Sequence, residues 1–171
     1  MTPREQEEYR ALRATIRERG TARMWLFALG LAAWGATVTA ILGLSLPPVA
    51  TLVSLVVLAG TFEAVLALHV GVERIGRYLL VFHGDAWEQA AGAFGRPAGA
   101  LAVDALFGTI FLASTVVNLL PLLTTTPIVQ ELVLVGGAHL AFVVRLVRAR
   151  AAAARQRAVD TKRFEELRQA P

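Results

Sequence analysis

Few residues inside the long apolar stretches of this chain carry groups that could do chemistry. The chain has no cysteine, which excludes thiol catalysis, iron–sulfur clusters and thiolate zinc sites. An ionisable group in hydrocarbon is costly and usually serves a purpose. The polar residues in or next to these stretches are Glu63, His69, Glu73, Asp104, Asn118 and His139.

The expected depths of these residues predict which of them meet. At about 1.5 Å per helical residue, Glu63 lies ~10 Å before Val70, and His139 lies ~9 Å before Arg145. Asp104 enters at the start of the third stretch, in the same half of the membrane. Asn118 falls near the opposite end. Glu63, His139 and Asp104 are therefore the candidates for an ion or proton site.

The matched depths support two hypotheses. In the structural one, Glu63 and His139 form a hydrogen-bonded pair that sets the register of their helices, and Gly136 and Gly137 allow close approach. In the other, the same carboxylate and imidazole form a proton- or ion-coupled pathway. A third function class, a membrane-embedded lipid-modifying enzyme, would use Glu63, His69, Glu73 and Asp104.

One pair has the spacing of metal ligands. His69 and Glu73 are four residues apart, so both can face one ion on a helix. Pairs of this kind are also common at membrane boundaries, where they bind no metal. The histidines at 69, 83 and 139 fall at different depths, which disfavours bis-histidine haem. We expect no cofactor.

The elements that carry these residues are apolar enough for a bilayer. Hydrophobic residues make up 56% and charged residues 18% of the chain, against roughly 45–50% and 25% in soluble domains. A spanning helix needs about 17–25 apolar residues. The sequence predicts an all-α integral membrane bundle of four transmembrane helices at 24–44, 49–70, 101–123 and 128–147.

The basic residues predict the orientation. All 17 lie in 1–23, 71–100 and 145–171. By the positive-inside rule, both termini and the middle loop are cytoplasmic, and the membrane is the plasma (inner) membrane. We expect a cytoplasmic amphipathic helix at 1–23, a four-span domain at 24–144 with a loop at 71–100, and a basic helical tail at 145–171. The loop should hold a further amphipathic helix after a capping box at 85–88.

Local signals refine this picture. Thr2 and Glu5 form a capping box around Pro3, and Gly20 is expected to end the first helix. That helix is a solvated element, lies on anionic lipid or docks a partner. Gly84 should stop the cytoplasmic extension of the second span. Phe164 and Leu167 of the tail are expected to pack on the amino-terminal helix.

Small residues predict helix packing in the first span. Ala28, Ala32, Ala36 and Ala40 recur at a spacing of four, and we expect this face to pack against another span.

The function expected from these features is non-enzymatic. We expect a small bacterial inner-membrane protein, with arginine strongly preferred to lysine, that acts as an accessory or scaffold subunit. Its partners are anionic lipid and a homo-oligomer or larger membrane complex, and no nucleic acid is expected. The arginines expected at lipid headgroups are Arg19, Arg23, Arg74, Arg77, Arg145 and Arg148.

Overall fold

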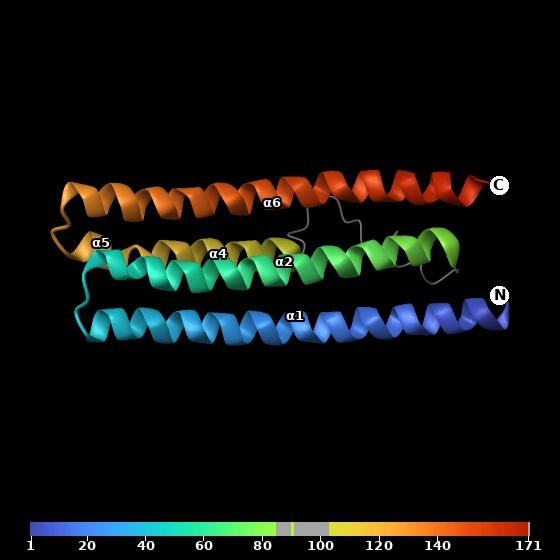
Figure 1. The fold of residues 1–171 in the computed structure, drawn as a ribbon, viewed down its shortest axis with the longest axis horizontal. Coiled ribbons are helices and arrows are strands. Elements are labelled where there is room, and N and C mark those ends of the chain that lie inside the picture. The colour runs from blue at the N-terminus through green and yellow to red at the C-terminus, as the bar shows by residue number, and fades with distance from the viewer. Residues whose placement is uncertain (85–89, 91–102, 171) are drawn as a thin grey trace. The chain divides into compact units, whose positions relative to one another are not determined.

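The computed structural model describes residues 1–84, 90 and 103–170. These residues confirm an all-helical fold, and none of them lies in a strand. The elements in chain order are α1 (Pro3–Gly43), the 3₁₀ turn η1 (Pro48–Ala50), α2 (Thr51–Phe82), α4 (Val103–Asn118), α5 (Leu120–Thr124) and α6 (Val129–Gln169) (Figure 1). The amphipathic helix expected in the middle loop lies outside the described residues.

Within the described residues, three helical segments are long and apolar enough to cross a membrane: Pro3–Gly43, Pro48–Phe82 and Val129–Gln169. The expected third span is different, because its apolar helical stretch in the described residues is the shorter Gly108–Leu123. It is also interrupted, since α4 ends at Asn118 and α5 begins at Leu120. Pro121 explains the break: it has no N–H to donate, and its ring clashes with the carbonyl four residues before it.

The chain divides into two compact units. We call one the apolar unit; it contains Trp25–Val65 and Leu101–Arg150. The other, the charged unit, contains Met1–Met24, Leu66–Ala100 and Ala151–Pro171. Each unit is described by itself below.

The start of α1 confirms the capping box. The Thr2 N–H donates to Glu5 Oε2 at 2.7 Å, and the Glu5 N–H donates to Thr2 Oγ1 at 3.3 Å. The predicted stop at Gly20 is wrong, because α1 continues to Gly43. An interior glycine costs a helix only about 1 kcal/mol, which the helix-forming residues around it offset. The end of α2 at Phe82 agrees with the stop expected from Gly84.

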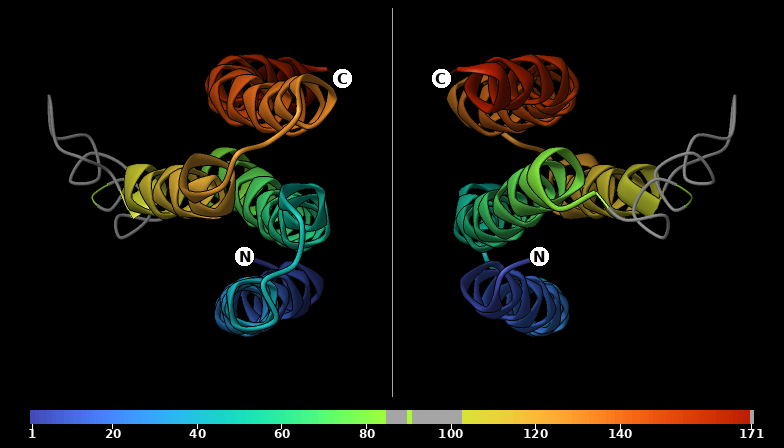
Figure 2. Two further views of the ribbon diagram at one scale, coloured as in Figure 1. Left: turned by 90° about the vertical axis from the view of Figure 1, so that its left-hand side faces the viewer. Right: turned by 90° about the vertical axis from the view of Figure 1, so that its right-hand side faces the viewer.

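The turn between α1 and α2 is tight and hydrogen-bonded (Figure 2). The Leu46 N–H donates to the Ile41 carbonyl at 3.0 Å, and the Ser45 N–H donates to the Leu42 carbonyl at 3.2 Å. This is a Schellman ending, which places one residue in the left-handed region. Here that residue is Ser45, with φ 50°.

In the apolar unit, α1 packs through a different face from the one expected. Val38 and Ile41 are buried, whereas Ala28, Ala32, Ala36 and Ala40 are all exposed. The close approach occurs at Gly30, where an added Cβ would lie 2.2 Å from Thr61 Cγ2. The predicted packing of the alanine row against another span of this chain is therefore wrong. A glycine lets a neighbouring helix come closer than an alanine row does.

Candidate functional site

The apolar unit contains a buried polar cluster, which we define as Thr51, Ser54, Asn118 and His139. Asn118 is its centre. Its Nδ2 donates to the Thr51 carbonyl at 3.0 Å and to His139 Nε2 at 2.9 Å, and its Oδ1 accepts from Ser54 Oγ at 2.5 Å. The cluster thus joins α2, α4 and α6 by side-chain hydrogen bonds.

The cluster determines the protonation state of His139. Its Nδ1 lies 2.7 Å from the Val135 carbonyl, which can only accept, so Nδ1 carries the proton. Nε2 is then the acceptor for the Asn118 amide. A second proton on Nε2 would face the Asn118 amino group, and turning the amide around would bring Oδ1 against the Thr51 carbonyl oxygen. The arrangement therefore favours a neutral imidazole.

Four phenylalanines extend the core of the apolar unit. Phe111 of α4 makes edge-to-face contacts with Phe27 at 5.8 Å and Phe62 at 5.2 Å between ring centroids. Phe62 makes a third such contact with Phe142 of α6 at 5.9 Å. These pairs connect α1, α2, α4 and α6 by rings whose edges and faces attract each other.

Glu63 and His139 do not form the pair expected from the sequence. Glu63 is bound by Arg145, with Arg145 Nη2 donating to Oε2 and Arg145 Nε lying next to Oε1, both at 2.7 Å. His139 instead binds Asn118. Equal distance from the expected membrane boundary did not identify the partner, because the long Arg145 side chain reaches Glu63 from another position on α6. The His139 ring instead faces Asn118 at the end of α4.

The sequence also predicts roles in this region for Gly136, Gly137 and Asp104. An added Cβ at Gly136 or Gly137 meets no described atom within 4 Å, so these glycines give no close approach to the part of the chain that the structure describes. Asp104 lies in the first turn of α4, but its side chain is outside the described residues. Its role in an ion or proton site stays a prediction.

The expected metal pair lies in the charged unit. His69 Nε2 is 3.6 Å from Glu73 Oε1, and His69 Nδ1 is 2.8 Å from Arg23 Nη1. Glu73 also accepts from Arg77 at 3.3 Å and from Arg157 at 3.1 Å. Among the residues that the structure describes, no group of three or more His, Asp or Glu side chains could hold a metal ion. Glu73 is therefore an ion-pair partner of the arginines around it.

Asp160 is the centre of the second network in the charged unit. Its side chain accepts from Arg77 at 2.9 Å, from Arg74 at 3.3 Å and from Gln156 at 2.7 Å. The residue is only 8% exposed. Burial by itself raises the pKa of Asp160, but the hydrogen bonds from Gln156, Arg77 and Arg74 lower it overall. Asp160 thus holds the ends of α2 and α6 together as a carboxylate.

Aromatic contacts support the same pairing of α2 with α6. Phe164 makes edge-to-face contacts with Tyr78 at 5.7 Å and with Phe82 at 6.3 Å. Leu167 is 56% exposed. The predicted packing of Phe164 on the amino-terminal helix is wrong, because its ring packs against the rings of Tyr78 and Phe82 on α2. The amino-terminal helix instead reaches α2 through Glu8, whose Oε1 accepts from the Tyr78 hydroxyl at 2.7 Å.

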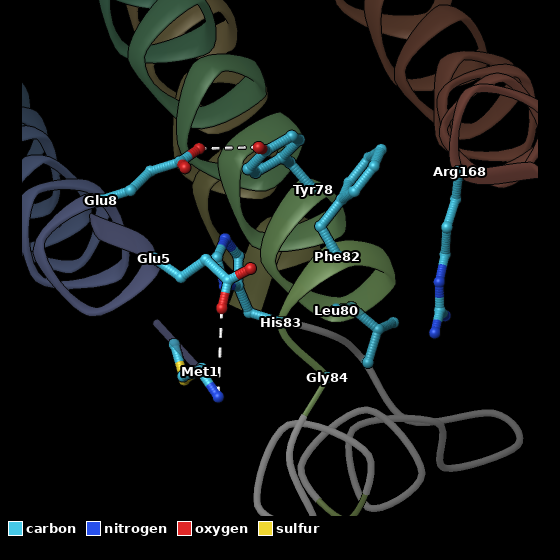
Figure 3. Close-up of a pocket in the computed structure, with 9 residues that line it drawn as sticks. All are labelled: Met1, Glu5, Glu8, Tyr78, Leu80, Phe82, His83, Gly84 and Arg168. Atoms are coloured by element: carbon cyan, nitrogen blue, oxygen red, sulfur yellow. Dashed lines mark hydrogen bonds and ion pairs between the residues drawn. The ribbon is translucent and has the colours of Figure 1, made fainter. Parts of the chain in front are cut away.

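A pocket of about 460 Å³ opens beside these residues (Figure 3). Figure 3 shows Glu8 turned toward Tyr78, and Glu5 turned toward the amino group of Met1. The hydrogen bond to Glu8 raises the pKa of Tyr78, and the backbone hydrogen bond from Thr2 lowers the pKa of Glu5. Both carboxylates therefore have partners from the chain itself. The pocket is lined by Met1, Glu5, Glu8, Tyr78, Leu80, Phe82, His83, Gly84 and Arg168.

The arginines expected at lipid headgroups fall into two groups. Those in contact with other side chains of this chain are Arg23, Arg74, Arg77 and Arg145. Arg19 and Arg148 are exposed, and Arg19 Nη1 lies 2.9 Å from where a Cβ on Gly71 would be. Headgroup contact stays a prediction for all six.

Several central residues were not expected from the sequence. Thr51 and Ser54 gave no signal, because hydroxyl side chains are common in apolar helices. The expected depth of Asn118, near the opposite end of its helix, separates it from Glu63 and His139. Asp160 had a usable signal: it is the sole acidic residue between Arg145 and Phe164, in a basic segment.

Comparison with known proteins assigns no family to this arrangement. No protein-family model matches the chain, and neither a curated protein nor a solved structure matches it.

Proposed function

We propose that this chain is a four-span membrane protein that acts as a non-enzymatic scaffold or accessory subunit. Its apolar unit lies in the bilayer of the plasma (inner) membrane, with α4 and α5 together forming the third of the four spans. Both termini, and with them the charged unit, are cytoplasmic and face anionic headgroups. Its function is to present fixed helix surfaces to other membrane components.

The buried polar cluster is the observation that carries this proposal. Every polar side-chain group in it has a partner within the chain, and the imidazole is held neutral between Val135 and Asn118. In hydrocarbon, such bonds hold helices together where no hydrophobic force does so. A transport site, in contrast, needs a group that can exchange its proton or ion with water. The cluster therefore supports a structural task for His139.

The outer surface of the apolar unit is consistent with a lipid environment. Large apolar side chains are exposed on each of its long helices, among them Trp25, Val56 and Val133, at 64%, 70% and 68%. A soluble monomer rarely exposes apolar patches of such extent. Lipid or the apolar surface of a partner would cover these side chains.

Labelling of introduced cysteines tests the orientation. Because the native chain has no cysteine, Leu46→Cys and Thr125→Cys each provide a single reactive site. We expect both to react with a membrane-impermeant maleimide added outside intact spheroplasts. Glu7→Cys and Arg163→Cys are the controls and should react only after permeabilisation. Labelling at position 46 or 125 only from the interior would refute the topology.

The alternative function is a proton- or ion-coupled transporter or channel that uses Glu63 and His139. One observation favours it: the Glu63 side chain is 48% exposed although it lies in an apolar helix. We expect purified protein in proteoliposomes to show no proton flux above that of empty vesicles. Flux that disappears in Glu63→Gln, but not in the exposed-site control Thr39→Ala, would establish the transporter instead.

A further inference from the structure

The ion pair of Glu63 and Arg145 is placed where an ion pair is expensive. Along α2, Glu63 is ~18 Å from Thr51, and along α6, Arg145 is ~24 Å from Val129, at about 1.5 Å per residue. Both positions fall within the ~30 Å hydrocarbon thickness. The two side chains are nevertheless 48% and 45% exposed. In a lone chain, half of this pair would face lipid.

The helix faces around the pair are narrow and smooth. On α2, Val53, Val56 and Gly60 share the face of Glu63, and all are exposed.

The corresponding face of α6 has the same character. Leu134, Gly137 and Ala141 share the face of Arg145 and are exposed as well. An added Cβ at Gly60 or Gly137 would meet none of the described atoms within 4 Å. These glycines differ from Gly30, which its own chain uses for close packing against Thr61.

We propose that this face, defined by Val53, Val56, Gly60 and Glu63 on α2 and by Leu134, Gly137, Ala141 and Arg145 on α6, binds a second copy of the chain. The inference rests on the proposed membrane function and names its first partner. A glycine inside a helix costs about 0.5–1 kcal/mol relative to alanine. Close approach of a neighbouring helix at open glycines is the usual compensation in membranes.

Charge complementarity identifies a second copy as the occupant. A two-fold axis along the membrane normal keeps every residue at its own depth and makes the interface self-complementary. Glu63 of one copy then faces Arg145 of the other, and the reverse contact forms by symmetry. Two carboxylates and two guanidiniums alternate around the axis, and each exposed half of the pair receives an opposite charge. The face is therefore complementary in charge to the same face of a second copy.

A chain with exchanged charges tests this interface without breaking the ion pair of the monomer. The double variant Glu63→Arg with Arg145→Glu keeps one carboxylate and one guanidinium in contact. It should pair with itself, as the native chain does. A mixed pair would oppose like charges at both contacts, which costs several kcal/mol.

The measurement is disulfide cross-linking in membranes. Ala141→Cys is introduced into the native chain and into the double variant Glu63→Arg with Arg145→Glu. The two chains carry different tags and are co-expressed. Copper phenanthroline is the oxidant. We expect cross-linked pairs of like chains, and mixed pairs at least about tenfold below the statistical proportion. Mixed pairs in statistical proportion would overturn the proposal.

A matched cysteine controls for the face. Ala36→Cys is also an exposed alanine of the apolar unit, but it lies on α1, and it should not cross-link. Cross-linking at 36 without cross-linking at 141 would overturn the interface. So would cross-linking of Ala141→Cys to a different protein only. Maleimide labelling at 46 and 125 is measured in the same cells, so that failure of the interface is distinguished from failure of the topology.

Discussion

The apolar unit and the charged unit are built from the same three long helices, yet different interactions hold each unit together. In the apolar unit, the contacts between helices include the buried polar cluster, the edge-to-face phenylalanines, the close approach at Gly30 and a single ion pair, Glu63 with Arg145. In the charged unit they are ion pairs around Asp160 and Glu73, together with the hydrogen bond from Tyr78 to Glu8.

The difference follows from the solvent that each unit is suited to. In lipid, apolar side chains gain no hydrophobic free energy by meeting one another, so close packing and polar hydrogen bonds decide which helices associate. In water, ion pairs are screened, and each contributes little unless several share a partly buried centre. The apolar unit should therefore depend on single residues more than the charged unit does.

The largest effect is expected from Asn118→Leu in the apolar unit. The substitution removes three hydrogen bonds and leaves His139 Nε2 buried without a partner, whereas the Ser54 hydroxyl can still donate to the Thr51 carbonyl at 2.9 Å. An unsatisfied buried group costs about 1–3 kcal/mol and each further lost hydrogen bond about 1 kcal/mol, so we expect a loss of roughly 2–4 kcal/mol. Unfolding by SDS titration in mixed micelles, followed by circular dichroism, measures it.

Thr115→Val is the control on the same helix. Thr115 is equally buried, but its hydroxyl donates only to the Phe111 carbonyl of its own helix at 2.7 Å. We expect a loss below about 1 kcal/mol, because no bond between helices is broken. Equal losses for the two variants would mean that the cluster does not hold the helices together.

Gly30→Ala tests the close approach of α1. The new Cβ would overlap the Thr61 side chain, whose hydroxyl is held by the Val57 carbonyl at 2.8 Å. We expect a loss of about 1–3 kcal/mol from this overpacking. The second substitution Thr61→Ala should recover most of it, and Gly35→Ala, at an open site, should have little effect. The same SDS titration applies, and absence of rescue would argue against this contact.

Much of the fold could be predicted from the sequence, because it depends on patterns that are local along the chain. Apolar length predicted the three long helices, and capping chemistry predicted the start of α1 at Thr2 and Glu5. Pro121 is a helix-breaking residue that the sequence shows directly, yet the predicted third span extends past it to residue 123. That α4 and α5 form the third span, and that both termini are cytoplasmic, stay predictions.

The candidate site was harder to predict, since it depends on how side chains reach between helices. The pairing of Glu63 with His139 assumed that residues at equal backbone depth meet. The long side chain of Arg145 reaches Glu63, and His139 binds Asn118 on a third helix. The packing predicted for the row of alanines is wrong for a related reason. Their spacing shows that one helix face carries small side chains, but not which helix packs against that face.

Acid should loosen the charged unit before the apolar unit. The pKa of Asp160 is lowered below its ordinary value of 3.8 by Gln156, Arg77 and Arg74 against the effect of burial. Its stabilising contribution is therefore complete above about pH 4 and is lost as the pH falls through the lowered pKa. We expect hydrogen exchange in 151–169 to accelerate below about pH 4, ahead of exchange in 129–150.

Two variants make the acid prediction specific to Asp160. Asp160→Asn should remove the acid step and cost about 1–2 kcal/mol at neutral pH, since hydrogen bonds to charged groups are lost. Glu166→Gln is the control; its side chain is 63% exposed and should leave the step unchanged. An acid step that persists in Asp160→Asn would assign it to another carboxylate.

The smallest effect is expected at the turn between α1 and α2, and it has the opposite sign. Ser45 occupies the left-handed position of a Schellman ending at φ 50°, where a side chain costs about 1 kcal/mol and glycine costs little. Ser45→Gly should therefore stabilise the apolar unit by up to about 1 kcal/mol, less the entropy that glycine adds to the unfolded chain. Ser45→Val should destabilise it, because a β-branched side chain tolerates this conformation least. SDS titration measures the free energy of unfolding of the two variants. Equal values for Ser45→Val and Ser45→Gly would show that residue 45 does not keep its left-handed conformation in the membrane.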